Sequence, residues 1–456
     1  MSNIKTLQQY RTKLFEDIYN NVIPDRVPIN INICKEAVAE FGGMSIKDIN
    51  WKPEKLMPAA VDICNKVYSD VCPANFFSTR YPGQYEMSRS RSFEMGSSGF
   101  VQHPEVSGML LEDYDYLIEK PFDCLVERVI PRLNRGFSSD SPMEVALSFT
   151  KTFNIKNADF FTGLGLVGKL KEQFGYYADN GMARAFTTAP FDFLADQLRG
   201  FSTIPVDMRR LPDKVLAACE AIYPLMVKAG IPKMMTPHAR AYSYLHMPTY
   251  MREKDFEKFY WPTFLKMCNT HAAMGIQIDT FCEDNWDRYL DYLLELPANT
   301  ILKFEYGDAQ LIKDKLGKKH IITGLYPITL LKTGTKTECV DKAKELVDIL
   351  APGGKYLFSF DKVIISAGSI NLENLNAVTE YVRDHTQYSN AGEVAGIAFN
   401  KEDYADYADG MPDLNSRYYT TAEEYQRENN MLTPEASHKL QSFDDKMFEF
   451  LIQLLF

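Results

Sequence analysis

The sequence lacks the features that would direct a chain to a membrane, to nucleic acid or to an oxidising compartment. Its 456 residues contain no uninterrupted apolar run long enough to span a bilayer, and the first ten residues have no apolar core of a signal peptide. A net charge of −11 argues against non-specific binding to nucleic acid or anionic membranes. The eight cysteines include no CxxC pair, which argues against zinc-finger and thioredoxin-type sites. We therefore expect a cytoplasmic protein with reduced thiols.

Four strand-like runs in the second half of the chain each end in a polar residue with catalytic potential. They cover residues 275–283, 300–308, 320–327 and 355–361. Helix-like segments follow the first three runs, at about 286–296, 308–316 and 336–350. Strands that alternate with helices of this length indicate βαβ units and a parallel sheet. Functional groups at the carboxyl ends of successive strands are typical of the active face of a (β/α)₈ barrel.

A first strand is predicted much earlier, where residues 29–33 alternate strictly between isoleucine and asparagine. We therefore expect an α/β fold, a (β/α)₈ TIM barrel with N-terminal, inserted and C-terminal helical additions. The barrel and its N-terminal helices would span residues 1–388. Residues 389–456 would form a C-terminal extension packed on the barrel, ending in an amphipathic helix near 435–456.

Several short motifs, in order along most of the chain, match those of a known family. They are Asp25-Arg-Val-Pro28, Gln102-His-Pro-Glu105, Leu198-Arg-Gly200, Phe259-Tyr-Trp-Pro262, Cys282-Glu283 and Gly324-Leu-Tyr-Pro327. In these motifs and their spacing the chain resembles the uroporphyrinogen decarboxylase superfamily, and within it the corrinoid-dependent methyltransferase branch. The resemblance implies a (β/α)₈ barrel that transfers methyl groups.

Two departures from the family patterns narrow the expected activity. The true decarboxylases carry arginines after the first strand to hold the propionates of the porphyrinogen, whereas residues 29–34 here contain none. We therefore expect no decarboxylation of uroporphyrinogen. The methyltransferases that serve coenzyme M bind zinc through His-x-Cys and a later cysteine. Here those positions read Thr280-Phe-Cys282 and Phe360-Asp361, so any zinc would rely more on carboxylates.

The resemblance places a zinc site at the ends of two neighbouring strands. Its ligands would come from Cys282, Glu283, Glu305 and Asp308, and a catalytic zinc needs about three protein ligands plus one open position. Simpler alternatives exist. Cys282 could be a buried thiol, Glu283 a solvated or ion-paired carboxylate, and Asp308 the N-cap of the helix that runs to Leu316. Glu305, on the last turn of an inner strand, would need a partner.

Catalytic and substrate-binding roles are expected at five further residues. His238, in a predicted loop over the active face, is a candidate ligand, proton donor or substrate contact, with a structural histidine as the alternative. Asp361 stands where the relatives have their last cysteine ligand, and pairing with the following lysine is its alternative. Tyr326 is a further catalytic candidate, and Asn30 and Glu105 are candidates for substrate binding.

The expected function is that of a zinc-dependent, cytoplasmic methyltransferase. It would move a methyl group from a small methylated substrate, such as a methoxylated aromatic, to the cobalt of a corrinoid on a separate protein, since the chain has no evident corrinoid-binding module. Three alternatives stay open: transfer from methylcobamide to a thiol or other acceptor, a metal-free decarboxylase of a non-porphyrin carboxylate, and a non-catalytic corrinoid-binding protein. Neither nucleic acid nor a membrane is expected as a partner. The sequence leaves the oligomeric state open, with a homodimer as one candidate.

Overall fold

A six-stranded parallel sheet forms the centre of the protein. The computed structural model describes residues 2–76, 80–408 and 413–456. The strands lie in the order β10-β9-β8-β7-β6-β5, and every neighbouring pair is parallel. Their bounds are β5 (Arg184–Thr188), β6 (Arg240–Leu245), β7 (Gln277–Asn285), β8 (Ile301–Tyr306), β9 (Ile321–Gly324) and β10 (Tyr356–Leu357). The predicted α/β class with parallel strands is confirmed.

Short pairings extend the sheet beyond β10. Ile29 forms a parallel bridge with Phe358, and Ile33 forms one with Ile364. The two-residue strand β1 (Ile33–Cys34) pairs in parallel with β2 (Ala74–Asn75). Eight parallel segments therefore follow one another in chain order. Among the residues that the structure describes, no backbone pairing joins β2 to β5.

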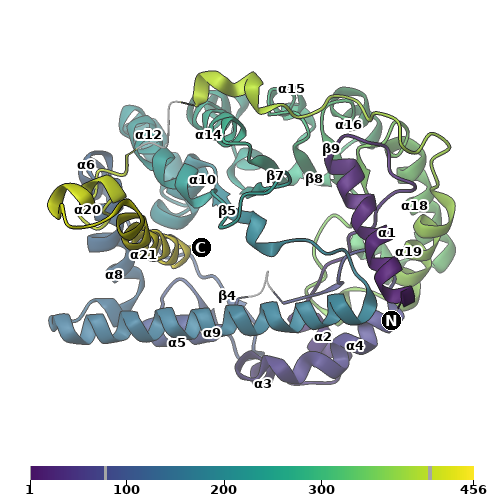
Figure 1. Ribbon diagram of the computed structural model, residues 1–456, viewed down its shortest axis with the longest axis horizontal. Coiled ribbons are helices and arrows are strands. Elements are labelled where there is room, and N and C mark those ends of the chain that lie inside the picture. Colours follow the sequence, from purple (N-terminus) through teal and green to yellow (C-terminus); the bar gives the residue numbers. More distant parts are fainter. Residues whose placement is uncertain (1, 77–79, 409–412) are drawn as a thin grey trace.

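Helices surround the outer face of this sheet (Figure 1). The main ones are α12 (Pro212–Ala229), α14 (Trp261–Ala273), α16 (Ala309–Leu316), α18 (Lys336–Leu350) and α19 (Leu372–His385). The start of α18 is a reciprocal capping box between Thr335 and Glu338. Its buried residues recur every three or four positions, at Cys339, Ala343, Leu346, Val347 and Leu350. None of the helices in the described ranges is both long and apolar enough to cross a membrane.

The first helix, α1 (Ser2–Tyr19), closes the amino-terminal end of the sheet. Its side chains Phe15, Ile18 and Tyr19 pack with one residue from each of β8, β9 and β10. Those three are Ile301, Ile321 and Leu357, and all six side chains are buried. This small cluster is separate from the main hydrophobic core, so the inner face of the sheet has its own apolar floor.

A cavity of about 1190 Å³ opens where β2 and β5 are not paired. The inner face of the sheet and its flanking strand contribute Asn30, Arg184, Phe186 and Tyr242 to its lining. The long helix α9 (Pro142–Phe174) and the last helix α21 (Pro434–Gln453) supply other walls. The C-terminal part of the chain thus lies against the sheet, where the ring of Phe456 meets that of Phe186 edge-on at 4.7 Å.

Candidate active site

The inner face of the sheet carries a row of polar and aromatic side chains. Successive side chains of a strand point to opposite faces, so in β6 the residues Tyr242 and Tyr244 share one face with His246, which follows the strand directly. In β7 the same alternation puts Phe281 and Glu283 on the inner face. The register pairs Tyr244 with Phe281, so the residues two positions further along, His246 and Glu283, are brought together at the carboxyl edge.

An ion pair between His246 and Glu283 forms the centre of this edge. The His246 Nδ1 atom contacts a carboxylate oxygen of Glu283, and each side chain stays about one-third exposed, at 31% and 37%. Burial opposes the imidazolium form, but the bond to Glu283 and the charges of Asp192 and Asp196 outweigh it and raise the pKa of His246 above its ordinary value. His246 therefore keeps its proton to a higher pH than an unpaired imidazole would.

Asp192 positions the loop that carries this histidine. It ends the short helix α10 (Pro190–Asp192), which follows β5, and its side chain is buried. Its carboxylate accepts hydrogen bonds from the Tyr260 hydroxyl at 2.6 Å and from the Met247 backbone N–H at 2.9 Å. Burial raises the pKa of Asp192 to about 7. The loop after β6 is thus tied to the segment after β5 through one buried carboxyl group.

A second acid and a second histidine lie close to the pair. Asp196 belongs to the π-helical segment η6 (Phe193–Arg199) that continues α10. Burial raises the pKa of Asp196 in spite of the charges of His246, His103 and Arg80. The ring of His103 stacks on that of Phe93 at 4.3 Å, and burial lowers the pKa of this histidine. Two carboxyls and two imidazoles with differing pKa values can donate and accept protons in one place.

Four aromatic rings line the inner face below the ion pair. Phe186 from β5 lies 5.4 Å from Tyr244, which contacts Tyr242 at 5.0 Å and Phe281 at 6.4 Å. The His246 ring stacks on Tyr244 at 5.3 Å with an interplanar angle of 21°. All four side chains are half-buried. The rings contact one another and form a continuous aromatic surface beside the ion pair.

A lysine of the next strand lies beside the ring of Phe281. Lys303 lies on the inner face of β8, and its Nζ atom is 5.5 Å from the centre of the Phe281 ring. Burial lowers the pKa of Lys303 to about 8, against the opposing charges of Asp361 and Asp279. Asp279 in turn is 3.4 Å from a guanidinium nitrogen of Arg184.

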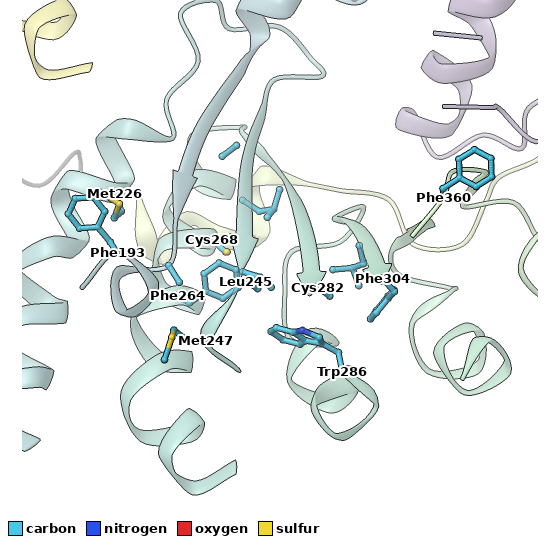
Figure 2. Packing of buried hydrophobic residues seen from close by; sticks show 14 of the residues in the cluster. Phe193, Met226, Leu245, Met247, Phe264, Cys268, Cys282, Trp286, Phe304 and Phe360 are labelled. Carbon is cyan, nitrogen blue, oxygen red and sulfur yellow. The ribbon is translucent and has the colours of Figure 1, made fainter. Parts of the chain in front are cut away.

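Cys282 does not face this site. It is fully buried in the hydrophobic core, on the face of β7 opposite Glu283. Figure 2 shows it among Leu245, Phe304 and Trp286, on the side where the helices pack. Burial raises the pKa of its thiol to about 12, so it stays protonated. Cys282 therefore lies away from Glu283, as the buried-thiol alternative predicts, because adjacent residues of a strand point to opposite faces.

The remaining predicted metal ligands have other partners. Glu305 forms an ion pair with Lys362 and accepts a hydrogen bond from the Asp284 backbone N–H at 2.8 Å. Asp308 is the N-cap of α16 and accepts from the Leu311 N–H at 3.0 Å, which confirms the capping alternative. In the described part of the chain, no three His, Cys, Asp or Glu side chains come close enough together to hold a metal ion. The four expected ligands are therefore not gathered into one site.

The three predicted catalytic residues do not form one site: the Asp361 backbone N–H donates to the Tyr326 carbonyl at 2.8 Å, whereas His238 lies at the other end of the sheet. His238 precedes β6, at the amino-terminal end of the sheet, and its ring contacts that of Tyr19 in α1 at 5.6 Å. Its expected place over the active face is wrong, because the strand begins only after it. Tyr326 is fully buried and donates to the Cys339 carbonyl at 2.9 Å. Asp361 accepts from the backbone N–H groups of Ile328 and Lys362, which holds the chain between β9 and α17 (Ile328–Thr333).

The two predicted substrate-binding residues have different surroundings. Asn30 lines the cavity, and its backbone N–H donates to the Phe358 carbonyl at 2.9 Å. Glu105 is exposed and accepts from the backbone N–H of Ser202 at 2.9 Å and from its hydroxyl at 3.0 Å. These bonds lower the pKa of Glu105. Asn30 is thus placed to touch a bound molecule, whereas Glu105 fixes a surface loop.

Comparison with family models and with curated protein sequences identifies no relative. No family model matches the chain, and no curated protein sequence matches it either. The resemblance to the methyltransferase branch therefore stays a prediction from the motifs, and the arrangement of side chains on the inner face has to carry the functional argument.

Proposed function

We propose that this chain is an enzyme that transfers a methyl group from a small methylated substrate to the cobalt of a corrinoid on a separate protein. The observation that carries the proposal is the ion pair of His246 and Glu283 beside an aromatic inner face. It lies at the carboxyl ends of parallel strands, where barrel enzymes place their active sites. The motif resemblance supplies the reaction class.

We propose further that the eight parallel segments form a (β/α)₈ barrel interrupted between β2 and β5. The floor built by α1 and the ring of outer helices support this. In such a barrel the inner residues of β5, β6, β7 and β8 share one chamber, and the cavity beside β5 is its side entrance.

The ion pair can supply the proton that methyl transfer from oxygen needs. When the bond between the methyl carbon and the substrate oxygen breaks, the methyl group goes to cobalt and the electron pair stays on the oxygen. Protonated His246 donates its proton to that oxygen, so the demethylated product leaves as a neutral hydroxyl compound. Glu283 keeps the imidazole charged and oriented. Asp192 holds the backbone that presents the histidine.

The described side chains do not fit the zinc site that the resemblance implies. A catalytic zinc needs three protein ligands, whereas only His246 and Glu283 of the metal-binding residue types touch each other here. No step of the proposed reaction runs through a metal. Zinc therefore remains a prediction of the resemblance alone.

A second candidate is a metal-free decarboxylase of a non-porphyrin carboxylate. The specific observation in its favour is Lys303, a cation on the inner face that takes part in no ion pair among the described residues. Such a lysine could hold or activate a carboxylated substrate.

The decisive experiment mixes the purified chain with a reduced corrinoid protein and a set of methoxylated aromatics. We expect formation of methylcobalt, seen in the corrinoid absorption spectrum, together with release of the hydroxyl product. His246→Gln should lower the rate by about 10²–10⁴, which is the usual worth of a general acid. His238→Gln is the matched control, because this histidine lies at the opposite end of the same strand. Carbon dioxide release without any corrinoid would overturn the proposal in favour of the decarboxylase.

A further inference from the structure

We propose that a hollow on the protein surface, walled by four arginines, binds a small soluble anion with several phosphate groups, such as a short polyphosphate. The hollow has a volume of about 520 Å³ and is lined mostly by arginines, at Arg91, Arg128, Arg132 and Arg135. It lies beside the short helix α8 (Ile130–Leu133), close to the start of the long helix α9 (Figure 1). Its described lining residues are separate from those of the cavity beside β5 and from the candidate active site, so this inference does not rest on the proposed function.

Two segments of the chain bring the four guanidinium groups to one place. Three of the arginines follow one another on the helical segment at 125–137, and Arg91 lies on a loop that runs alongside it. Backbone hydrogen bonds join the two segments. The Arg91 N–H donates to the Leu133 carbonyl at 2.8 Å, and the Arg135 N–H donates to the Arg89 carbonyl at 3.2 Å. The backbone under the arginines is therefore fixed without a ligand, which lowers the entropic cost of binding one.

The helix departs from regular geometry where it forms the wall of the hollow. Pro131 lines the hollow and has no backbone N–H, so the usual helical bond to the carbonyl four residues back cannot form there. The turn before it is π-helical, and the Ile130 N–H bonds to the Leu125 carbonyl, five residues back. Arg128 belongs to this turn. Single π-helical turns of this kind occur frequently at functional sites.

The acidic residues near the hollow already have basic partners. Asp113 is fully buried and pairs with Arg128 at 2.8 Å and with Arg132. Glu127 is the one carboxylate among the described lining residues. It pairs with Arg417 and accepts hydrogen bonds from two tyrosine hydroxyls, each at 2.9 Å. Neither carboxylate is free to neutralise a further cation.

Arg91 and Arg135 are the two cations left over. The ion pairs around the hollow involve Arg128, Arg132 and Arg417 instead, and within the described ranges neither Arg91 nor Arg135 takes part in one. Both are exposed, and Arg91 donates from Nη1 to the Arg132 carbonyl at 3.2 Å. The hollow is thus positively charged in a chain of net charge −11. Like charges held close together repel one another, so the hollow attracts an anion.

The lining of the hollow indicates which anion fits. A guanidinium group presents a planar fork of donors that matches two oxygens of a phosphate group, and several phosphate groups can occupy several forks at once. The Ser138 hydroxyl is a further donor. Among the described lining residues there is no aromatic ring on which a nucleotide base could stack. The volume lies in the range of small-molecule sites, which favours a compact polyphosphate.

The test measures binding of tripolyphosphate to the full chain by calorimetry in metal-free buffer of low ionic strength. We expect one site per chain, with an affinity that falls as salt is added. Arg91→Gln and Arg135→Gln should each weaken binding by about tenfold, as the loss of one charge-assisted contact would give. Arg91→Lys should restore only part of the affinity, because an ammonium group cannot form two parallel bonds. Arg209→Gln, at an exposed arginine outside the hollow, is the matched control and should bind like the wild type.

Four results would overturn the inference. Tripolyphosphate does not bind, or orthophosphate binds as tightly, so that several phosphate groups are not required. Arg209→Gln weakens binding as much as the variants of the hollow, so that the anion responds only to the general surface charge. A glutamate peptide of equal charge binds more tightly, so that an acidic protein segment is the occupant. Circular dichroism checks the fold of each variant, and if Arg91→Gln does not fold, Arg135→Gln decides. The assay contains no corrinoid protein and no methylated compound, so its failure leaves the proposed function untouched.

Discussion

Two fully buried histidines should make the stability of this protein depend on pH in a way that a single substitution reveals. The Nε2–H of His271 donates one hydrogen bond at 2.8 Å to the Val227 carbonyl, and both ring nitrogens of His320 are buried. Burial lowers the pKa of His271 to about 4 and that of His320 to about 3. Lys319 and Lys355 add positive charge near His320.

The direction and size of this pH dependence follow from the number of protons that the folded and unfolded states bind. Between pH 6.5 and about 4, an unfolded histidine takes up a proton that the folded one refuses, so the free energy of unfolding falls as pH falls. Each unit of pH changes it by about 1.4 kcal/mol per group. From pH 7.5 to 5 this amounts to about 2 kcal/mol for His320.

The pH dependence of the unfolding free energy of the wild type alone hides this effect, because buried carboxyl groups change that free energy in the opposite direction. The raised pKa values of Asp192, to about 7, and Asp159, to about 6, make the folded protein bind protons more readily as pH falls. The informative quantity is therefore the difference between His320→Gln and the wild type in urea unfolding. That difference should shift by about 2 kcal/mol in favour of the variant between pH 7.5 and 5. The exposed His438→Gln is the control, and an unchanged difference for His320→Gln would refute the reasoning.

Three further predictions follow from the site and its strands. Cys282→Ala should lower the free energy of unfolding in urea by about 1–2 kcal/mol, because it leaves a cavity in the core, and should not change the metal content of the purified protein. A variant that loses metal but keeps its stability would show that Cys282 is a metal ligand. Glu283→Gln should lower the pKa of His246, so the rate of methyl transfer should begin to fall at a lower pH than in the wild type. An unchanged pH–rate profile on the alkaline side would contradict the role of the His246–Glu283 ion pair. Gly324→Ala should cost at least about 2 kcal/mol, because this glycine has φ +88° and an added Cβ would lie 2.2 Å from a strand carbonyl oxygen. Gly181→Ala, in open space, is its control.

The order of elements could be predicted from the sequence because hydrophobic patterning is local. The four strand-like runs at 275–283, 300–308, 320–327 and 355–361 overlap β7, β8, β9 and β10, although β10 is much shorter than its run, and residues 29–33 pair with the chain at 358–364. Each buried strand carries β-branched and aromatic residues over a short span, which identifies it without knowledge of its partners.

The site could not be predicted in the same way because it depends on which face each residue takes. Cys282 and Glu283 are neighbours in the sequence, but consecutive residues of a strand point to opposite faces of the sheet. His238 and His246 lie on either side of β6, so the choice between them needs the strand boundaries at Arg240 and Leu245. The alternation of Tyr242, Tyr244 and His246 was the available signal.

Other members of the site left no pattern to find. Asp192 and Asp196 lie where α10 passes into the π-helical segment η6, whose widened turn departs from the helical repeat. Lys303 reads as an ordinary polar residue of a strand, and only the pairing of β8 with β7 shows that it faces Phe281.

The gap between β2 and β5 has a consequence for the order in which reactants meet. A partner protein that delivers a corrinoid to His246 would cover the carboxyl edge of the sheet, and α1 blocks the opposite end. The cavity beside β5 would still connect Phe186 and Tyr242 with solvent. A small substrate could then exchange while the partner stays bound. Steady-state kinetics should therefore show random addition of the two reactants, whereas a compulsory order would mean that the side entrance is not used.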